Sequence, residues 1–363
     1  MKKYNITVYA ISKNESKFVD RWYESMREAD NIVVLDTGST DNTIEKLRTH
    51  DILVKSKKIE PWRFDRARNE SLKLIPKNTD ICVCTDLDEV FDKGWREKLE
   101  NCWQNNTKQL KYKYVWNELE NNKEGITFLY EKIHSYNNFI WVNPVHEILK
   151  PTTNISPNEI IINTDIVLRH FPDPQKSRKQ YLQLLEISIK EDPKNDRNMH
   201  YLAREYMYNY NYNKAISTFK KHLKLKTSVW REERSASLRY IGNCYFYLNK
   251  KKLAESYYLK SITECPTTRE PYFELANFYY LNNNYLLCIF TLNQMLNIKT
   301  KTLTYMTNPQ CWNELPYDML SFCYYKTNQL ENALVFANMA LKISPNNERI
   351  RNNINLYNSI LNK

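Results

Sequence analysis

A short pattern of residues recurs four times in the second half of this 363-residue chain. Each copy has Leu or Ile, a small residue, two variable residues and then Tyr, and successive copies start 39, 34 and 45 residues apart. A repeat of this length is one pair of helices that cannot bury its apolar face alone, so the copies must stack on one another. The copies begin at Leu202, Ile241, Leu275 and Leu320. They predict an all-α solenoid.

The residues that follow each copy support the same prediction. Nine positions after each Tyr stands a small residue, namely Ala215, Ala254, Cys288 or Ala333. The series resembles the tetratricopeptide repeat, whose period is about 34 residues. The resemblance implies that these small residues lie where the two helices of a pair cross. It assigns residues 176–363 to a helical repeat domain of about four repeats.

Short apolar runs alternate with helical periodicity in the first part of the chain. The runs typical of strands cover residues 6–11, 32–35, 52–54 and 81–85. Alternation of strands and helices predicts an α/β domain with a mainly parallel sheet, whose ligands bind beyond the carboxyl ends of the strands.

Residues 110–170 change in character. Four further runs look like antiparallel additions to the sheet, at residues 112–116, 126–133, 139–142 and 160–168. Pro172 and Pro174 then mark a boundary. We therefore predict two domains, an α/β domain over residues 1–175 and the helical repeats over residues 176–363.

Glycine is scarce, which restricts how the chain can bind a nucleotide. The chain has four glycines, whereas average usage would give roughly 25. They are Gly38, Gly94, Gly125 and Gly242, and none lies within six residues of another. The glycine-rich phosphate loops of dinucleotide-binding domains and P-loop enzymes both need close glycines. Carboxylates, a metal ion and ordinary side chains must therefore bind any nucleotide.

Charge is distributed unevenly along the chain. Residues 1–175 carry 26 Lys and Arg against 27 Asp and Glu, a net charge of −1. Residues 176–363 carry 27 against 15, a net charge of +12. The second half therefore favours acidic partners, although a solvated, lysine-rich helical surface would explain the same numbers. Nucleic acid is not expected, because the repeat offsets explain the many Tyr and Phe side chains as core.

The cysteines and the hydropathy of the chain indicate a soluble protein of a reducing compartment. None of the eight cysteines forms a C-x-x-C pair, so no zinc ribbon is predicted, and Cys82 and Cys84 fall in a strand as buried thiols. The first residues do not form a signal peptide, and no transmembrane run of 18 apolar residues occurs. We expect a cytoplasmic location.

Two acidic residues, Asp86 and Asp88, directly follow the apolar run at residues 81–85. We expect an extended segment there, on which residues two apart point to one face. Carboxylates that close repel each other unless a cation lies between them, and oxygen ligands suit Mg²⁺ or Mn²⁺. Asp36 stands at the end of an earlier strand. The arrangement predicts a metal-assisted nucleotide site.

These motifs resemble a family of known activity. The stretches at residues 11–15, 34–43 and 86–89, which read ISKNE, VLDTGSTDNT and DLDE, are similar to family 2 glycosyltransferases of the GT-A fold. The segment at residues 62–72, WRFDRARNESL, resembles one branch of that family. That branch joins the transferase to tetratricopeptide repeats and includes relatives of the sublancin S-glycosyltransferase.

The resemblance implies a set of donor-binding residues. Ser12 and Glu15 would lie near the nucleobase, and Asp36 would accept hydrogen bonds from the uracil or the ribose. Asp86 would face the ribose, with Leu87 beside it.

Three further residues of the donor side follow from the same resemblance. Asp88 would be a metal ligand. Arg68 and Asn69 would line the donor pocket, with Arg68 near phosphate. A purely structural Arg68, paired with Asp65 or Glu70, is the alternative.

The resemblance also implies catalytic and metal-binding residues further along the chain. Within residues 141–147, WVNPVHE, Glu147 would be the general base and His146 would orient it or contact phosphate. An ordinary exposed glutamate beside a turn is the alternative. His170 would complete the metal shell or touch the leaving phosphate, with a structural histidine closing a strand as the alternative. Lys132 stands where the family often has Arg, which leaves a phosphate contact there open.

Together these features predict an inverting glycosyltransferase. It would move a hexose from a UDP-sugar, UDP-glucose or UDP-N-acetylglucosamine, with Mn²⁺ or Mg²⁺ as the cofactor. The acceptor would be a protein, a peptide or a glycan, with acidic acceptors favoured by the charge of the repeats. The repeats would bind that acceptor or form a homodimer. The alternative is a scaffold protein whose transferase domain is degenerate.

Overall fold

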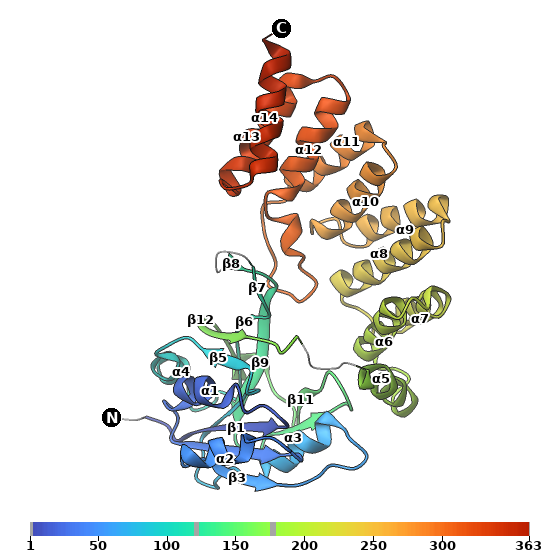
Figure 1. Cartoon of the computed structure of the whole chain (residues 1–363). Coiled ribbons are helices and arrows are strands. Elements are labelled where there is room, and N and C mark those ends of the chain that lie inside the picture. Colours follow the sequence, from blue (N-terminus) through green and yellow to red (C-terminus); the bar gives the residue numbers. More distant parts are fainter. Residues whose placement is uncertain (1–2, 120–122, 175–178, 363) are drawn as a thin grey trace. The chain divides into compact units, whose positions relative to one another are not determined.

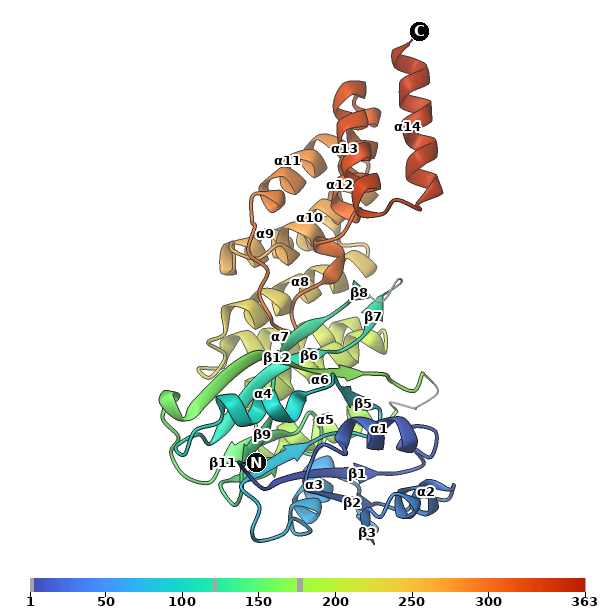
Figure 2. The same cartoon turned by 90° about the vertical axis from the view of Figure 1, so that its left-hand side faces the viewer.

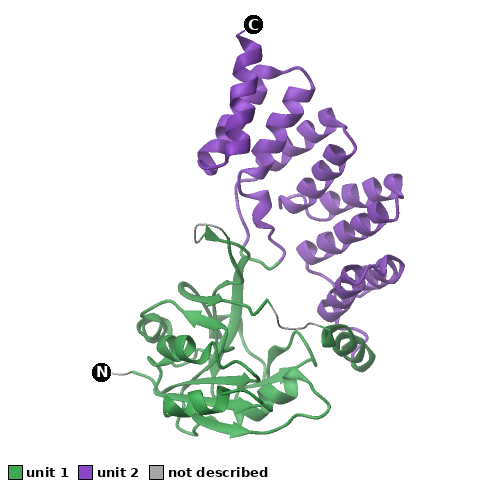
Figure 3. Ribbon diagram, in the orientation of Figure 1, with its two compact units in different colours: residues 1–191, 303–305 green, residues 192–302, 306–363 purple. Residues whose placement is uncertain are grey.

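The computed structural model describes residues 3–119, 123–174 and 179–362. By their contacts these residues form two compact units (Figure 3). The first contains the chain up to Glu191 together with Leu303–Tyr305, and the second contains Asp192–Thr302 and Met306–Lys363. This division falls after Glu191, whereas the boundary between residues 175 and 176 stays a prediction.

The first unit is built on an eight-stranded sheet with the strand order β3-β2-β1-β4-β9-β6-β12-β5 (Figure 1). Its strands are β1 (Ile6–Ser12), β2 (Asn31–Asp36), β3 (Leu53–Ser56), β4 (Ile81–Cys84), β5 (Glu89–Phe91), β6 (Gln109–Val115), β9 (Thr127–Ser135) and β12 (Ile160–His170). Two small antiparallel pairs accompany it, β7 (Glu118–Leu119) with β8 (Lys123–Glu124), and β10 (Phe139–Val142) with β11 (Ile148–Pro151).

The sheet is mixed, and this corrects one expectation. Strands β1 to β4 pair in parallel, as the alternation of strands and helices predicts. Strand β9 is antiparallel to both β4 and β6. Strand β12, however, runs parallel to β6 and antiparallel only to β5, so not all the added strands are antiparallel.

Helices cover both faces of this sheet because successive strand residues point to opposite sides. Ile6 and Val8 pack with Trp22 and Trp95 on one face, whereas Tyr9 packs on the other with β10. The helices on the sheet are α1 (Val19–Met26), α2 (Thr43–Thr49), α3 (Phe64–Leu72) and α4 (Trp95–Cys102). Helix α5 (Gln180–Glu191) also belongs to the first unit. A 3₁₀ turn, η2 (Pro157–Glu159), precedes β12.

The thiols expected in strand β4 are confirmed. Cys82 and Cys84 are fully buried, and all eight cysteines of the chain are free. Both thiols belong to the face of the sheet that packs against β10.

The second unit contains the four predicted helix pairs, and Figures 1 and 2 show them following one another in chain order. The pairs are α6 (Asp196–Tyr208) with α7 (Tyr212–Lys224), α8 (Arg231–Tyr247) with α9 (Lys251–Glu264), α10 (Glu270–Leu281) with α11 (Tyr285–Leu296), and α12 (Leu315–Lys326) with α13 (Leu330–Ile343). Helix α14 (Glu348–Leu361) follows, and a 3₁₀ turn, η3 (Pro309–Cys311), precedes α12.

The small residues of the repeat do lie in the helix contacts. Ala215, Ala254, Cys288 and Ala333 are all fully buried. A β-carbon on Gly242 would lie 2.6 Å from the ring of Tyr258, so α8 and α9 approach each other more closely than an alanine there would allow. The repeat pattern therefore marks the places where backbones must come close.

Candidate active site

Strands β1 and β2 place the first site residues side by side. Ser12 is the register partner of Asp36, and its hydroxyl donates to the Asp36 carboxylate at 3.1 Å. The same carboxylate accepts the backbone N–H groups of Gly38 at 3.0 Å and Ser39 at 2.9 Å. Gly38 has φ = +112°, a conformation that favours glycine. Asp36 is fully buried, so in this structure it shapes the Asp-x-Gly-Ser loop.

A neighbouring loop after β1 is tied to this one. The N–H of Asn14 donates to the Ser39 hydroxyl at 2.8 Å, and the N–H of Thr40 donates to the Asn14 side chain at 2.7 Å. Glu15 is buried, and its N–H donates to the hydroxyl of Thr43 at 2.8 Å. Ser12, Glu15 and Asp36 therefore belong to one rigid edge of the sheet, and their contacts with a nucleoside stay predictions.

The Asp-x-Asp segment is a turn, which corrects the extended geometry expected for it. The N–H of Glu89 donates to the Asp86 carbonyl at 3.0 Å, and the N–H of Asp86 donates to the Glu89 carboxylate at 2.8 Å. The turn buries the Leu87 side chain completely in the core, so a donor contact of Leu87 would have to use its backbone.

Arg68 connects two of the predicted site residues. It lies on α3 with 2% of its surface exposed. Its Nη2 donates to Asp86 Oδ1 at 2.6 Å and its Nε donates to Glu147 Oε1 at 3.1 Å. Burial alone lowers the pKa of an arginine, but Asp86 and Glu147 raise the pKa of Arg68 above its ordinary value. The alternative pairing with Asp65 or Glu70 is wrong, since Asp65 pairs with Arg63 and Glu70 with Lys57 and Lys73.

A second cation contacts the same turn, and it is Lys132, for which the family resemblance left a phosphate contact open. Lys132 on β9 has 3% of its surface exposed and lies 3.2 Å from Asp86 Oδ2 and 2.9 Å from Glu89 Oε1. Burial lowers the pKa of Lys132, but these carboxylates raise it above its ordinary value, so the amine stays charged. Tyr114 donates to Glu89 at 2.7 Å. The family resemblance pointed to a cation at Lys132, but not to its pairing with Asp86 and Glu89.

Pairing of β5 with β12 places His170 beside the second aspartate. His170 is the register partner of Glu89, and its Nε2 lies 3.4 Å from Asp88 Oδ2. The Nδ1 atom of His170 lies 3.0 Å from the carbonyl oxygen of Trp116, and the ring centres of these two residues are 4.5 Å apart. The backbone contact directs Nε2 toward Asp88, in the way a second-shell carbonyl orients a metal-bound imidazole.

A divalent cation fits this pair. Asp88 and His170 would supply two protein ligands, and within residues 3–119, 123–174 and 179–362 no group of three or more His, Cys, Asp or Glu side chains could hold a metal. Mg²⁺ is commonly held by one or two protein groups and completed by substrate phosphates and water. The donor set here matches that kind of shared site rather than a closed metal cage.

The hairpin of β10 and β11 carries Glu147 and His146. Asn69 fixes this hairpin by two hydrogen bonds with the backbone of Trp141, at 2.8 and 2.9 Å, so its side chain is engaged in structure. His146 has φ = +51° and its ring meets the edge of Tyr181 on α5 at 5.8 Å. Glu147 instead points to Arg68. His146 and Glu147 therefore contact different parts of the unit, and the roles predicted for both residues stay predictions.

The structure thus brings Arg68, Lys132, Asp86 and Glu147 into one ion-pair cluster. Asp88, two residues after Asp86 in the same turn, pairs with His170. Ser12 and Asp36 lie at the ends of β1 and β2, and β1 pairs with both β2 and β4 in the sheet. Beyond the carboxyl ends of parallel strands is where α/β sheets bind their ligands.

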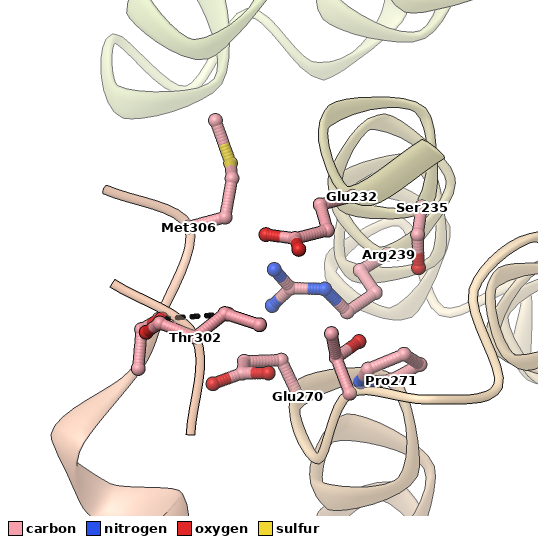
Figure 4. Close-up of a pocket in the computed structure, with 9 residues that line it drawn as sticks. Glu232, Ser235, Arg239, Glu270, Pro271, Thr302 and Met306 are labelled. Atoms are coloured by element: carbon pink, nitrogen blue, oxygen red, sulfur yellow. Dashed lines mark hydrogen bonds between the residues drawn. The ribbon is translucent and has the colours of Figure 1, made fainter. Parts of the chain in front are cut away.

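The second unit has a small recess of its own, lined by residues of α8, α10 and the loop after α11 (Figure 4). The Arg239 side chain extends between Glu232 and Glu270 there. The recess has a volume of about 10 Å³, which is room for about one water molecule. It is too small for a sugar or a nucleotide.

Comparisons with known families agree with this architecture. Residues 7–147 match the family described as Glycosyl transferase family 2. Residues 241–268 match a tetratricopeptide repeat, and residues 270–363 match the Prolyl 4-hydroxylase peptide-substrate-binding domain. The glycosyltransferase match falls within the α/β unit, and the other two matches fall on the helical repeats. The chain carries a family 2 glycosyltransferase domain followed by tetratricopeptide repeats.

Three solved structures are each similar to about half of the chain. MamA is 18% identical with a TM-score of 0.37, covering 46% of this chain and 89% of its own. YrrB, described as a TPR protein with an unusual peptide-binding site, is 13% identical with a TM-score of 0.39 and covers 49% and 84%. A Cytophaga hutchinsonii TPR repeat-containing protein is 16% identical with a TM-score of 0.41 and covers 50% and 67%. Similarities this low carry no functional argument.

Two further findings complete the comparison. No curated protein matches the chain in sequence. Within the described ranges, no helix has both the length and the apolar character needed to cross a membrane.

Proposed function

We propose that this chain is a metal-assisted, inverting glycosyltransferase that moves a hexose from a UDP-sugar to a protein, peptide or glycan acceptor. The observation that carries the proposal is the ion-pair cluster in which Arg68 joins Asp86 to Glu147. This one guanidinium fixes the distance between a carboxylate on the donor side and a carboxylate suited to act as a base. The WRFDRARNESL segment supports a place in the branch of the sublancin S-glycosyltransferase.

The donor would occupy the edge of the sheet where β1, β2 and β4 end. Ser12, Glu15 and Asp36 would meet the nucleoside, and Asp86 would meet the ribose. Asp88 and His170 would hold Mg²⁺ or Mn²⁺ together with the diphosphate, and the ion would stabilise the negative charge that develops on the leaving UDP. UDP-glucose and UDP-N-acetylglucosamine remain the two candidate donors.

Glu147 would accept the proton of the attacking acceptor group. Its Oε1 is held by Arg68, and within the described residues its Oε2 makes no hydrogen bond. As the acceptor oxygen, nitrogen or sulfur forms its bond to the anomeric carbon, the bond from that carbon to the β-phosphate oxygen breaks. The electron pair leaves with UDP and the proton passes to Glu147, so one displacement inverts the anomeric configuration.

The repeats would present the acceptor. Their match to a peptide-substrate-binding domain over residues 270–363 supports a peptide or protein acceptor. The net charge of +12 on residues 176–363 favours an acidic one. A homodimer formed through the repeats stays a prediction. Eight free cysteines support a reducing, cytoplasmic location.

A thermal-shift experiment on the full chain tests the donor site. UDP, GDP, CDP and dTDP are each added with and without Mn²⁺ to the wild type and to Asp88→Ala. Saturation at about 100 Kd should stabilise the protein by roughly 2.7 kcal/mol. Of the four nucleotides, we expect only UDP to raise the Tm, and only when Mn²⁺ is present. We expect Asp88→Ala to lose this rise.

Asp92→Ala is the matched control, because Asp92 pairs with Arg169 outside the proposed donor contacts. It should keep the Mn²⁺-dependent shift with UDP. If no nucleotide shifts the wild type, the transferase proposal fails and the scaffold alternative replaces it. If Asp88→Ala keeps the whole shift, the metal site is wrong.

A further inference from the structure

One tryptophan of this protein is exposed, and it lies beside the pair proposed to hold the metal. The chain has eight tryptophans, all within the described residues. Trp116 has 43% of its surface exposed, whereas the other seven are buried or half-buried. Its ring centre lies 4.5 Å from that of His170, whose Nε2 lies 3.4 Å from Asp88 Oδ2. Tryptophan is enriched at binding interfaces, where its large ring supplies much of the contact.

The backbone around Trp116 is held firmly at the base of a hairpin. The N–H of Trp116 donates to the carbonyl of Ile126 at 2.8 Å, and its own carbonyl oxygen lies 3.0 Å from His170 Nδ1. A β-carbon on Gly125 would lie 2.7 Å from the Asn117 side chain, which is itself fixed because its Oδ1 accepts the N–H of Ile126 at 3.0 Å. The indole is therefore presented in a fixed place, so binding a ligand costs it little conformational freedom.

The topology of the sheet places Trp116 at the same edge as the residues predicted to meet the nucleoside. Strands β1, β2 and β4 are parallel, and β9 is antiparallel to both β4 and β6, so β6 runs in the direction of β4. Strand β12 is parallel to β6. Trp116 directly follows β6 and His170 ends β12, so both lie at the carboxyl edge with Ser12 and Asp36.

The order of strands along this edge matches the order of groups in a UDP-sugar. The strands run β2, β1, β4, β9, β6 and β12, so Trp116 lies on the far side of β4 from Ser12 and Asp36. In the proposed site the diphosphate shares its metal with Asp88 and His170. The diphosphate separates the nucleoside from the hexose, so the hexose is the part of the donor that extends toward Trp116.

We propose that Trp116 binds the transferred hexose, an inference that rests on the proposed transferase function. The carbon-bound hydrogens on one face of a pyranose carry partial positive charge, and the face of an indole is negative. The indole N–H of Trp116 makes no hydrogen bond within the described chain, so it can donate to a hexose hydroxyl. The contact with His170 Nδ1 uses the Trp116 backbone, which any residue would supply, so orienting His170 does not explain the indole.

Isothermal titration calorimetry of the full chain with Mn²⁺ tests this contact, with UDP, UDP-glucose and UDP-N-acetylglucosamine as the probes. For the UDP-sugar that the wild type binds, Trp116→Ala should raise the Kd by about tenfold, the upper end of what one aromatic contact contributes. The Kd for UDP should change by less than about twofold, because UDP has no hexose. Circular dichroism checks that the variant is folded.

Ile162→Ala is the matched control. Ile162 lies on β12, the strand that carries His170, and 60% of its surface is exposed, so this variant also removes a large exposed apolar side chain from the first unit. We expect neither Kd to change by as much as about twofold. Equal weakening of UDP and the UDP-sugar by Trp116→Ala would show that the indole acts only through His170, and it would overturn the proposal. An unchanged Kd for the UDP-sugar would overturn it as well.

A second pair of variants keeps the test informative if Trp116→Ala does not fold. Trp116→Phe and Trp116→Leu both keep an apolar side chain, but only phenylalanine has an aromatic face. The Kd for the UDP-sugar should be at least about threefold lower for Trp116→Phe than for Trp116→Leu. Equal values would overturn stacking on the hexose.

The wild-type titrations separate this proposal from the proposed function. Binding of UDP with an affinity for the UDP-sugar that does not depend on Trp116 rejects only the hexose contact. Binding of UDP but of neither UDP-sugar also rejects that contact. Absence of any nucleotide binding rejects the transferase, and the hexose contact with it.

Discussion

Lys132 illustrates how single residues hold the transferase site in shape. It is buried under the Asp-x-Asp turn and contacts both Asp86 and Glu89. Two carboxylates so close together would repel each other without it, and Glu89 is itself 1% exposed. Removing one partner of a buried ion pair leaves an uncompensated charge, which costs far more than the net value of the pair.

Lys132→Met should therefore destabilise the first unit by about 3–5 kcal/mol. Urea unfolding followed by tryptophan fluorescence measures the loss. Lys113→Met is the control, because Lys113 pairs with Glu124 near the surface, where an ion pair contributes about 0–1 kcal/mol. A Lys132→Met variant no less stable than Lys113→Met would contradict the structural role given to Lys132.

Motifs marked the places of two loops at the end of the sheet. The Asp-x-Gly-Ser stretch marked the loop that Asp36 forms. The Asp-x-Asp run marked the carboxylates that follow β4 but not their turn, since an extended segment was expected there. The partners of those residues were not predictable. Glu147 is 79 residues from Arg68 and Lys132 is 46 residues from Asp86, so only the folded sheet brings them together.

At the scale of helices and strands, the repeat pattern was the strongest predictor, because each small residue answers a steric need. Gly242 shows this most clearly. Its missing side chain makes room for Tyr258, whose buried ring cannot move away since its hydroxyl donates to Asn243 at 2.6 Å.

Gly242→Ala should lower the free energy of unfolding by a net amount of roughly 0–2 kcal/mol. Overpacking costs about 1–3 kcal/mol, and the better helix propensity of alanine returns about 1 kcal/mol. In a Tyr258→Leu background, where the ring is gone, the same change should become neutral or stabilising. Urea titration of the four proteins of this cycle gives the coupling, and an equal loss in both backgrounds would show that the contact with Tyr258 is irrelevant.

Strand direction and chain reversal were the features of this scale that sequence patterns did not encode. The run at residues 160–168 has the apolar character of a strand, and that character is the same in parallel and antiparallel pairing. Its parallel pairing with β6 depends on the path that the chain takes between the two strands. The turn at Asp86–Glu89 contains neither Gly nor Pro, so nothing in its composition opposed an extended segment.

For the whole molecule, the order of the two parts and their classes were predictable because each has its own periodicity. The α/β core and the repeat cores consist of separate sets of residues. The division between compact units was less accessible, since α5 groups with the first unit although its sequence is helical like the repeats.

The separate cores predict that stability changes in the two units are additive. A Lys132→Met/Gly242→Ala double variant should lose the sum of the two single losses to within about 0.5 kcal/mol. Calorimetry should show each single change lowering a different transition. A single transition that both changes lower alike would contradict separate cores.

The ladder between β5 and β12 has a consequence for how this protein can change over generations. His170 faces Asp88 because it is opposite Glu89, and it is opposite Glu89 because a fixed number of residues separates it from the bulge between Asn163 and Val167. Losing one residue there would turn every later side chain to the other face of the sheet. Along this strand, substitutions leave the register unchanged, whereas loss of a single residue between the bulge and His170 would move the histidine away from Asp88.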